Sequence, residues 1–503
     1  MNGMSDRSEE ILDVVIVGGG LSGVGAACHL SERCPTRTFT ILEARGAIGG
    51  TWDLFRYPGV RSDSDMHTLG YSFKPWRARK AIADGSSILA YVCEAAREHG
   101  IEKQIRYGHR LRSAHWSTAD AFWTLEVERV AGEGEPGEPV AIPRTTTIRG
   151  RFLFMCSGYY RYDRGHAPHF EGMERFGGRI VYPQFWPANL DHAGKRVAVI
   201  GSGATAITLV PAMAKTAAHV TMIQRSPTWV VSMPEVDRIA VAFRKLLPEA
   251  LAYRLTRWKN VMFQRWVYRQ TRVRPQKVRE KLLAAVRDHL GPDYDVEKHF
   301  TPRYDPWDQR LCLIPDADLF LALRDGRASV VTDRIARFTE SAIELESGAQ
   351  VEADIIVSAT GLELEVLGGV EFSIDGKRID FADTYTYKGM MYSDVPNLVQ
   401  TFGYINASWT LRADLTSEYV CRLLTAMDKH GARRATPRLR AEDRGMPARP
   451  WIADFTPGYM QRVMHLFPKQ GDRAPWLNTQ DYARDKEMVR KAPIEDGVIA
   501  LEA

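Results

Sequence analysis

The sequence lacks the features that mark disulfide-bonded, metal-binding and membrane-spanning proteins. Its six cysteines are scattered, without a Cys-x-x-Cys pair or the spacing of zinc ligands. This argues against a disulfide framework, a metal site and disulfide reductase chemistry. No apolar run reaches the roughly 18 residues needed to cross a bilayer, and no secretory signal opens the chain. We therefore expect reduced thiols, no metal and a cytoplasmic location.

A strong charge of either sign is also missing. The formal net charge is +5 over 503 residues, which is too small to suggest a nucleic-acid partner. The hydrophobic content of 45% and the charged content of 26% are ordinary for a globular enzyme. A chain of this length exceeds a single hydrophobic core, so we expect two or three domains.

What the sequence does contain is two glycine-rich loops, each preceded by an apolar strand and followed by a helix-like stretch and a second strand. The first loop is Gly18-Gly-Gly20-Leu-Ser22-Gly23, and the second is Gly201-Ser202-Gly203-Ala204-Thr205-Ala206. This order of elements is the context that a dinucleotide-binding fingerprint requires. The glycines let the backbone approach a pyrophosphate at the positive N-terminus of the helix.

The residue at the tip of the second strand distinguishes the two units. Glu43 ends the second strand of the first unit, and its carboxylate can accept hydrogen bonds from free ribose hydroxyls, as FAD or NAD requires. Arg225 stands at the same place in the second unit, where a guanidinium would bind a 2′-phosphate. The adjacent Ser226 could add a hydroxyl to that phosphate or cap a turn. The sequence thus predicts one FAD site and one NADP site.

These units predict an α/β fold with two Rossmann-like dinucleotide-binding domains and a helical insertion. We expect the FAD-binding domain to be built from residues 1–160 and 365–503, and the NADP-binding domain from residues 161–228 and 318–364. Residues 229–317 have a helical pattern and form the expected insertion.

The insertion contains an unusually basic stretch. Residues 238–281 hold thirteen Lys or Arg against two Glu, interleaved with Trp258, Phe263, Trp266 and Tyr268. A basic, aromatic-rich helix can lie on an anionic membrane surface. The alternative is a solvated helical face whose aromatic side chains pack on the core. We favour the second interpretation and keep a weak membrane-surface contact as the alternative.

Residues 49–63 carry a family resemblance. Gly50-Thr51-Trp52 and Arg56-Tyr-Pro-Gly59-x-Arg61-Ser62-Asp63 resemble the flavin-side loop of class B flavoprotein monooxygenases, in particular Baeyer–Villiger monooxygenases. Residues 305–313 and 406–410 are most similar to the branch that contains the ethionamide-activating monooxygenases. The resemblance covers nearly the whole chain in the same segment order, and it implies that residues of the 50–63 loop bind the cofactors: Gly50, Thr51, Trp52, Arg61, Ser62 and Asp63.

The resemblance implies a reaction as well. NADPH would reduce the flavin, O2 would add to give a C4a-peroxyflavin, and one oxygen atom would enter a ketone to form an ester or lactone. Arg310 matches the family's essential arginine, whose permanent positive charge suits a pocket in which anions form. Asp63 matches its acidic partner. Gln309 stands where many relatives have a lysine near the NADP phosphate or the nicotinamide ribose.

One position departs from the family. The linker signature begins at Phe170-Glu-Gly172 and ends at Trp186-Pro187, but its histidine is replaced by Tyr182, which cannot carry a positive charge near neutral pH. N- or S-oxygenation therefore stays open beside ketone oxidation. The basic insertion would also suit a dinucleotide-bound redox sensor or a membrane-associated interaction protein built on an oxygenase fold, but the intact glycine loops and the Arg310–Asp63 pair argue against lost chemistry. We expect a small apolar ketone or thioether substrate. The neighbourhoods of Trp409 and Met390-Met391 are compatible with it, since their apolar residues could line a tunnel or fill a core.

Overall fold

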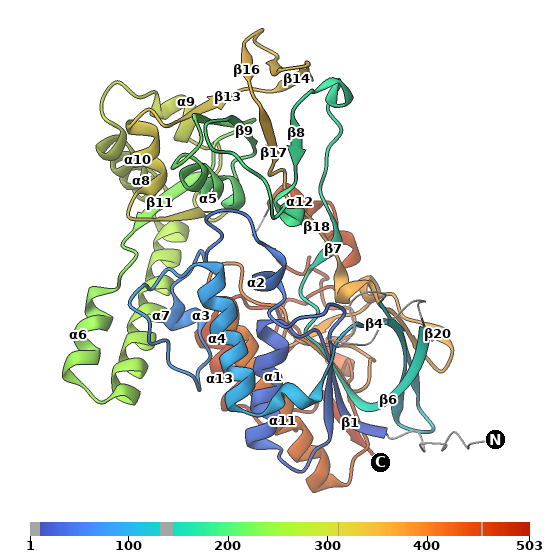
Figure 1. Cartoon of the computed structure of the whole chain (residues 1–503). Coiled ribbons are helices and arrows are strands. Elements are labelled where there is room, and N and C mark those ends of the chain that lie inside the picture. The colour runs from blue at the N-terminus through green and yellow to red at the C-terminus, as the bar shows by residue number, and fades with distance from the viewer. Residues whose placement is uncertain (1–10, 131–143, 310, 454–455) are drawn as a thin grey trace.

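The computed structural model describes residues 11–130, 144–309, 311–453 and 456–503 (Figure 1). Its largest sheet has the strand order β20-β19-β4-β5-β6-β1-β2-β3, with β23 also paired to β6. The parallel part consists of β1 (Ile11–Val17), β2 (Phe39–Leu42), β3 (Ile105–Arg106), β6 (Arg144–Met155) and β23 (Leu398–Gln400). The remaining strands are β4 (His109–Ser117), β5 (Phe122–Arg129), β19 (Glu371–Ile374) and β20 (Lys377–Arg378).

Strand β1 is an apolar run because both faces of the sheet are covered. Val14 and Ile16 belong to one hydrophobic cluster, which includes residues of the helices α1 (Leu21–Arg33), α4 (Gly85–Glu98) and α11 (Trp409–His430). Val15 and Val17 alternate into a second cluster on the other face. Strand β23 and helix α11 come from the last third of the chain, so a distant segment completes this sheet.

The second sheet is entirely parallel. Its strand order is β13-β10-β9-β17-β8. The strands are β8 (Arg179–Val181), β9 (Arg196–Ile200), β10 (His219–Gln224), β13 (Ala328–Thr332) and β17 (Ile355–Ser358), and the helices α5 (Ala204–Met213) and α10 (Asp318–Arg324) contact them. The expected α/β fold with Rossmann-like units is confirmed, whereas the five segment boundaries stay a prediction.

Between the two halves of this sheet the chain runs through a helical region. Its helices are α6 (Arg238–Leu246), α7 (Glu249–Val273), α8 (Pro275–Leu290) and α9 (Val296–Phe300). The region is bracketed by β11 (Trp229–Met233) and β12 (Leu311–Pro315), which pair in parallel. Helices α6 and α7 pack against each other along one flank of the molecule (Figure 1). Our interpretation that the aromatic side chains of this region pack on the core is wrong for Trp258, Phe263 and Trp266, which are exposed.

Shorter elements complete the described chain. The helices are α2 (Thr51–Leu54), α3 (Met66–Leu69), α12 (Gly458–Gln461) and α13 (Tyr482–Arg490). The strands form the sets β7 (Tyr160–Gly165) with β18 (Leu362–Leu364); β14 (Ile335–Phe338), β15 (Ala342–Leu345) and β16 (Gln350–Glu352); β21 (Thr386–Tyr387) with β22 (Met391–Tyr392); and β24 (Arg434–Pro437) with β25 (Ile499–Glu502). In the described residues, no helix is long and apolar enough to cross a membrane.

Candidate active site

The first glycine loop joins β1 to α1 and needs glycine for steric reasons. Gly18 has a φ of +104°, and a Cβ built there would lie 2.5 Å from the carbonyl oxygen of Cys156, at the end of β6. A Cβ on Gly23 would lie 1.8 Å from the carbonyl oxygen of Gly18. Gly20 directly precedes α1. The loop is therefore held tightly against its neighbours, with the N-terminus of α1 directed at a cavity that Gly18 and Gly20 line.

Glu43 braces this loop from the tip of β2. Its side chain is buried and accepts hydrogen bonds from the backbone N–H groups of Gly19 (2.7 Å) and Arg45 (2.8 Å). Burial raises the pKa of Glu43, although these two amides oppose the shift. Each carboxylate oxygen keeps a second lone pair, and Glu43 lines the cavity. The geometry is therefore compatible with the predicted contact to ribose hydroxyls.

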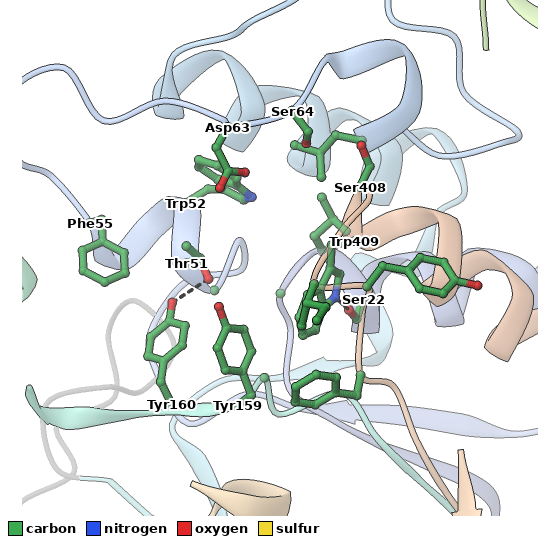
Figure 2. A pocket seen from close by; sticks show the side chains of 18 of the residues that line it. Ser22, Thr51, Trp52, Phe55, Asp63, Ser64, Tyr159, Tyr160, Ser408 and Trp409 are labelled. Carbon is green, nitrogen blue, oxygen red and sulfur yellow. Dashed lines mark hydrogen bonds between the residues drawn. The ribbon is translucent and has the colours of Figure 1, made fainter. Parts of the chain in front are cut away.

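The 50–63 loop forms a second wall of the cavity. Gly50 has a φ of +56°, and its Cβ would lie 3.0 Å from the Cα of Gly20, so the two loops approach backbone to backbone. The hydroxyls of Thr51 and Tyr160 share a hydrogen bond of 2.6 Å. Trp52 is half-buried and lines the cavity. Figure 2 shows Thr51, Trp52 and Asp63 as part of this wall.

Aromatic side chains form a third wall. The Trp409 indole N–H donates to the Ser22 hydroxyl at 2.8 Å, and the ring of Trp409 stacks on Tyr159 with centroids 5.2 Å apart (Figure 2). Trp409 was predicted as a substrate neighbour, but Tyr159 and Tyr160 were missed. The signal for them was Ser157-Gly158, since a strand that ends in Ser-Gly at a nucleotide loop directs the next residues into the site. Of the two positions left open for Met390 and Met391, a tunnel wall or the core, the structure shows the core, since both are fully buried and neither lines the cavity.

The cavity has a volume of about 1250 Å³, larger than the sites that usually hold a drug-sized molecule. It extends from the first glycine loop to α7 of the helical region. Among the described residues, the buried hydroxyl of Ser157 and the buried indole N–H of Trp307, both on the cavity wall, have no hydrogen-bond partner. These two unpartnered groups, and the glycine loop whose Gly18 and Gly23 leave no room for a Cβ, fit a bound dinucleotide.

Helix α7 is held to the start of α3, just after the 50–63 loop, by a carboxylate that the sequence did not single out. Asp65 accepts hydrogen bonds from the side-chain amides of Asn260 and Gln264, each at 2.9 Å, and caps α3 through the backbone N–H of Thr68. Nearby, Lys259 donates to Asp237 at 2.6 Å and, against the effect of burial, lowers the pKa of that carboxyl. The cavity wall is therefore polar where α7 meets Asp65.

The second glycine loop repeats the geometry of the first. Gly201 has a φ of +131°, and a Cβ there would lie 2.4 Å from the carbonyl oxygen of Ala359, at the end of β17. Gly203 precedes α5, and nothing lies within 4 Å of a Cβ built on it, so this face of the loop is open. Ala206, in the place of the third glycine, is fully buried. Of this loop only Thr205 lines the large cavity.

The open face of this second loop is next to positive charge. Arg225 follows β10, is exposed, and makes no hydrogen bond or ion pair with the described residues. Ser226 is also exposed, and its carbonyl accepts a hydrogen bond of 3.1 Å from the Ser202 hydroxyl. An unpaired guanidinium beside two glycines and a helix N-terminus fits the 2′-phosphate and pyrophosphate of NADP.

The remaining predicted residues lie in different surroundings. Asp63 is exposed and lines the cavity. Arg61 also lines it and pairs with Asp318 of α10 at 2.5 Å. Ser62 is buried, hydrogen-bonds with Ala83, and is not among the cavity-lining residues.

The 305–310 motif is described except for its last residue, because Arg310 lies outside the described residues. Gln309 beside it is half-buried. Trp307 has a φ of +72°, a strained conformation for a bulky residue that is typical of functional loops. Tyr182 is half-buried in the linker after β8 and does not line the cavity.

In the part of the chain that the structure describes, no group of three or more His, Cys, Asp or Glu side chains could hold a metal ion. All six cysteines are free thiols.

The chain is similar to known flavin enzymes. Residues 16–79 match the NAD(P)-binding Rossmann-like domain family, and residues 146–283 match the flavin-binding monooxygenase-like family. The chain is 51% identical over 488 residues to the FAD-containing monooxygenase EthA of Mycobacterium tuberculosis, covering 97% of each chain. It is 47% identical over 495 residues to the probable FAD-binding monooxygenase AlmA of Acinetobacter baylyi, covering 98% of this chain and 97% of the relative.

A solved structure supports the fold. An oxidized steroid monooxygenase bound to NADP superposes with a TM-score of 0.76 at 22% identity, covering 98% of this chain and 100% of the other. At that identity the likeness concerns the fold alone.

Proposed function

The chain belongs to the flavin-binding monooxygenase family, and from this premise we propose that it is an FAD- and NADPH-dependent Baeyer–Villiger monooxygenase that converts ketones to esters or lactones. The observation that carries the proposal is the large cavity that the first glycine loop and the 50–63 loop, including Asp63, line together. The positive partner expected for Asp63, Arg310, follows in the 305–310 motif.

The two nucleotides are assigned by the charges at the strand tips. Glu43 would accept hydrogen bonds from the ribose of FAD, and the backbone N–H groups of the first turn of α1, after Gly20, would face its pyrophosphate. Arg225 would pair with the 2′-phosphate of NADPH at the open face of the second loop. When bound, FAD accepts a hydride from NADPH and activates O2 for transfer of one oxygen atom.

The residues of the chain would supply charge and exclude water. The oxygen atom of a ketone becomes negative as its carbonyl carbon is attacked, and the guanidinium of Arg310 would stabilise that charge while staying protonated. Asp63 would orient Arg310. Trp52, Tyr159 and Trp409 would keep the reacting centre dry with their apolar rings, which strengthens these electrostatic interactions.

A second candidate is N- or S-oxygenation at the same site. Tyr182 favours it, since this residue breaks the linker signature of the Baeyer–Villiger family. Transfer of oxygen to a nucleophilic nitrogen or sulfur does not create a negative oxygen on a ketone, so it would depend less on Arg310.

Product analysis separates the two candidates. The purified yellow holoprotein is incubated with NADPH, air and a mixed panel of ketones and thioethers, and products are identified by mass spectrometry. Ester or lactone supports the proposal, sulfoxide alone supports the second candidate, and consumption of NADPH without oxygenated product contradicts both for that panel.

The role of Arg310 is tested in the same assay. Arg310→Ala should retain FAD and be reduced by NADPH, yet lose ester formation by two or more orders of magnitude, the size typical of a removed charge-stabilising group. Arg303→Ala is the matched control, because Arg303 is an exposed arginine seven positions earlier. Ester formation by Arg310→Ala at the wild-type rate would contradict the electrostatic role proposed for Arg310.

A further inference from the structure

Exposed apolar side chains gather on one part of the molecule. In the described residues, ten large hydrophobic side chains are exposed, and eight of them lie in α6, α7 or their connection. We call these eight the apolar face: Ile239, Leu246, Leu251, Trp258, Met262, Phe263, Trp266 and Val273. Single exposed apolar residues are common on proteins, but a concentration of this kind marks an interaction site.

Helix α7 carries large apolar side chains on its outer side, unlike an ordinary surface helix. Its inner side is mixed, since polar Asn260, Gln264 and Thr271 line the cavity together with apolar Val267. Trp258, Met262 and Trp266, spaced by four residues and therefore on one side of the helix, are 65%, 41% and 56% exposed. A surface helix normally turns its apolar stripe to the core and its polar face to water. The outer side of α7 is thus suited to a partner other than water.

Unpaired positive charge lies on the same side of α7. Arg254 is four residues before Trp258 and Arg269 is three residues after Trp266, so both follow the same stripe. Both are exposed and make no ion pair with the described residues. The inward basic residues differ, since Arg257 pairs with Asp414 and Lys259 pairs with Asp237.

From these observations we propose that the apolar face docks on the surface of an anionic lipid bilayer. Tryptophan prefers the boundary between headgroups and acyl chains, and neighbouring arginines are attracted to anionic headgroups. In a two-fold symmetric dimer, this face would meet the same face of the second copy, so Arg254 and Arg269 of both copies would gather at one interface and repel one another. Charge therefore favours lipid over self-association.

The docked face would share a rim with the cavity. Ile239 and Phe263 are about half exposed and also line the cavity, and the Phe263 ring stacks on that of Trp266 with centroids 6.2 Å apart. Apolar side chains therefore continue from the outer side of α7 to the cavity wall. If the proposed oxygenase function holds, this rim is where an apolar substrate dissolved in the bilayer would enter, but docking itself does not depend on that function.

The test is flotation of the holoprotein with lipid vesicles. One vesicle set is pure phosphatidylcholine, and the other contains seven parts phosphatidylcholine to three parts phosphatidylglycerol. The apolar variant is Trp258→Ser with Met262→Gln and Trp266→Ser, and the charge variant is Arg254→Glu with Arg269→Glu. The control is Phe185→Ser with Leu466→Ser, because these two residues are each 49% exposed but lie outside the apolar face.

We expect the wild type and the control to float with the anionic vesicles, and binding to weaken in high salt. The apolar variant and the charge variant should each bind the anionic vesicles at least about tenfold more weakly, while their melting temperatures and bound flavin stay unchanged. Absence of wild-type binding to anionic vesicles, or equal binding by all four proteins, would overturn the proposal. So would a wild-type dimer in lipid-free solution that the apolar variant converts to a monomer, since the face would then join two copies.

Discussion

At the scale of single residues, we expect the choice of nucleotide to depend on the side chain of Arg225. It is exposed after β10, free of ion pairs within the described residues, and next to a glycine loop with an open face. A charge-assisted hydrogen bond contributes about 1.5–3 kcal/mol. Arg225→Ala should therefore raise the KM for NADPH at least about tenfold and leave the KM for NADH nearly unchanged, as steady-state kinetics with both nucleotides would measure.

The matched control for this prediction is Lys215→Ala. Lys215 is an exposed cation just beyond the C-terminal end of α5, at the end of the helix far from the glycine loop. Its removal alters the net charge equally but should leave both KM values unchanged. An equal rise in both KM values for Arg225→Ala would show that the residue does not distinguish the 2′-phosphate.

The positions of the glycines could be predicted from the sequence because their requirement is local. Gly18 and Gly201 each have a positive φ and leave no room for a Cβ, and a motif of a few residues encodes both constraints. The hydrogen bonds that Glu43 accepts from Gly19 and Arg45 could not be predicted, because they depend on the path of the chain after β2. Met390 shows a further limit, since apolar character does not distinguish a core residue from a pocket wall.

At the scale of secondary-structure elements, Asp65 joins α7 to the start of α3. Its carboxylate accepts from Asn260, Gln264 and the backbone N–H of Thr68. Asp65→Ala would leave these donors without their acceptor and remove the cap of α3, at a cost of about 2–4 kcal/mol. We expect a melting temperature several degrees lower by calorimetry, together with more NADPH consumed per product formed.

Ser64→Ala is the control for this prediction, because the neighbouring Ser64 also lines the cavity. It should melt like the wild type. An Asp65→Ala protein with unchanged stability and unchanged coupling of NADPH to product would show that α7 is held in place by other contacts.

A buried charge cluster joins three helices and makes stability depend on pH. Asp414 of α11 accepts from Nε2 of His29 in α1 at 3.1 Å, from the backbone N–H of Ser72 at 2.9 Å and from Arg257 of α7 at 3.2 Å. Burial opposes ionisation, but these partners hold the pKa of Asp414 below its usual value of 3.8. A lowered pKa in the folded state gives stability above the unfolded pKa, and that stability is lost as the pH falls through the folded pKa.

The melting temperature should therefore fall steeply below about pH 4. Asp414→Asn should be less stable at neutral pH, because Arg257 is left buried beside a neutral group, and its melting temperature should depend less on pH in the acid range. Asp428→Asn serves as the control, since Asp428 is mostly exposed. If Asp414→Asn and the wild type lose stability in parallel on acidification, other carboxyls are responsible.

Element by element, sequence periodicity predicted the helices of the insertion but not their orientation. Helix α7 has apolar residues at helical spacing on its outer side, and both polar and apolar residues toward the cavity. Periodicity locates an apolar stripe without saying whether that stripe faces core, lipid or solvent. Our expectation of core packing followed the commoner case, and it was wrong for Trp258 and Trp266, which are exposed.

At the scale of the whole molecule, the cavity is assembled from segments far apart in the chain. Its walls include the first glycine loop, the 50–63 loop, residues after β6, the inner side of α7 and the start of α11. The family resemblance implied this assembly, because the same segment order recurs across the chain. Composition and periodicity alone did not, since nothing local in β23 or α11 indicates that they complete the first sheet.

A ligand that contacts all of these segments should stabilise the entire fold. Binding to the native state alone adds about 2.7 kcal/mol when the free ligand is a hundredfold above its Kd. Removing FAD should therefore lower the melting temperature by several degrees in differential scanning calorimetry, and added FAD should restore it in a concentration-dependent way.

Because the second loop contributes only Thr205 to the large cavity, NADP⁺ should act separately. It should raise the melting temperature of the wild type but not of Arg225→Ala, whereas FAD should stabilise both. Equal melting temperatures of the FAD-free and FAD-bound proteins would contradict flavin binding in the cavity. If NADP⁺ stabilised Arg225→Ala as much as the wild type, the proposed NADP site after β10 would be wrong.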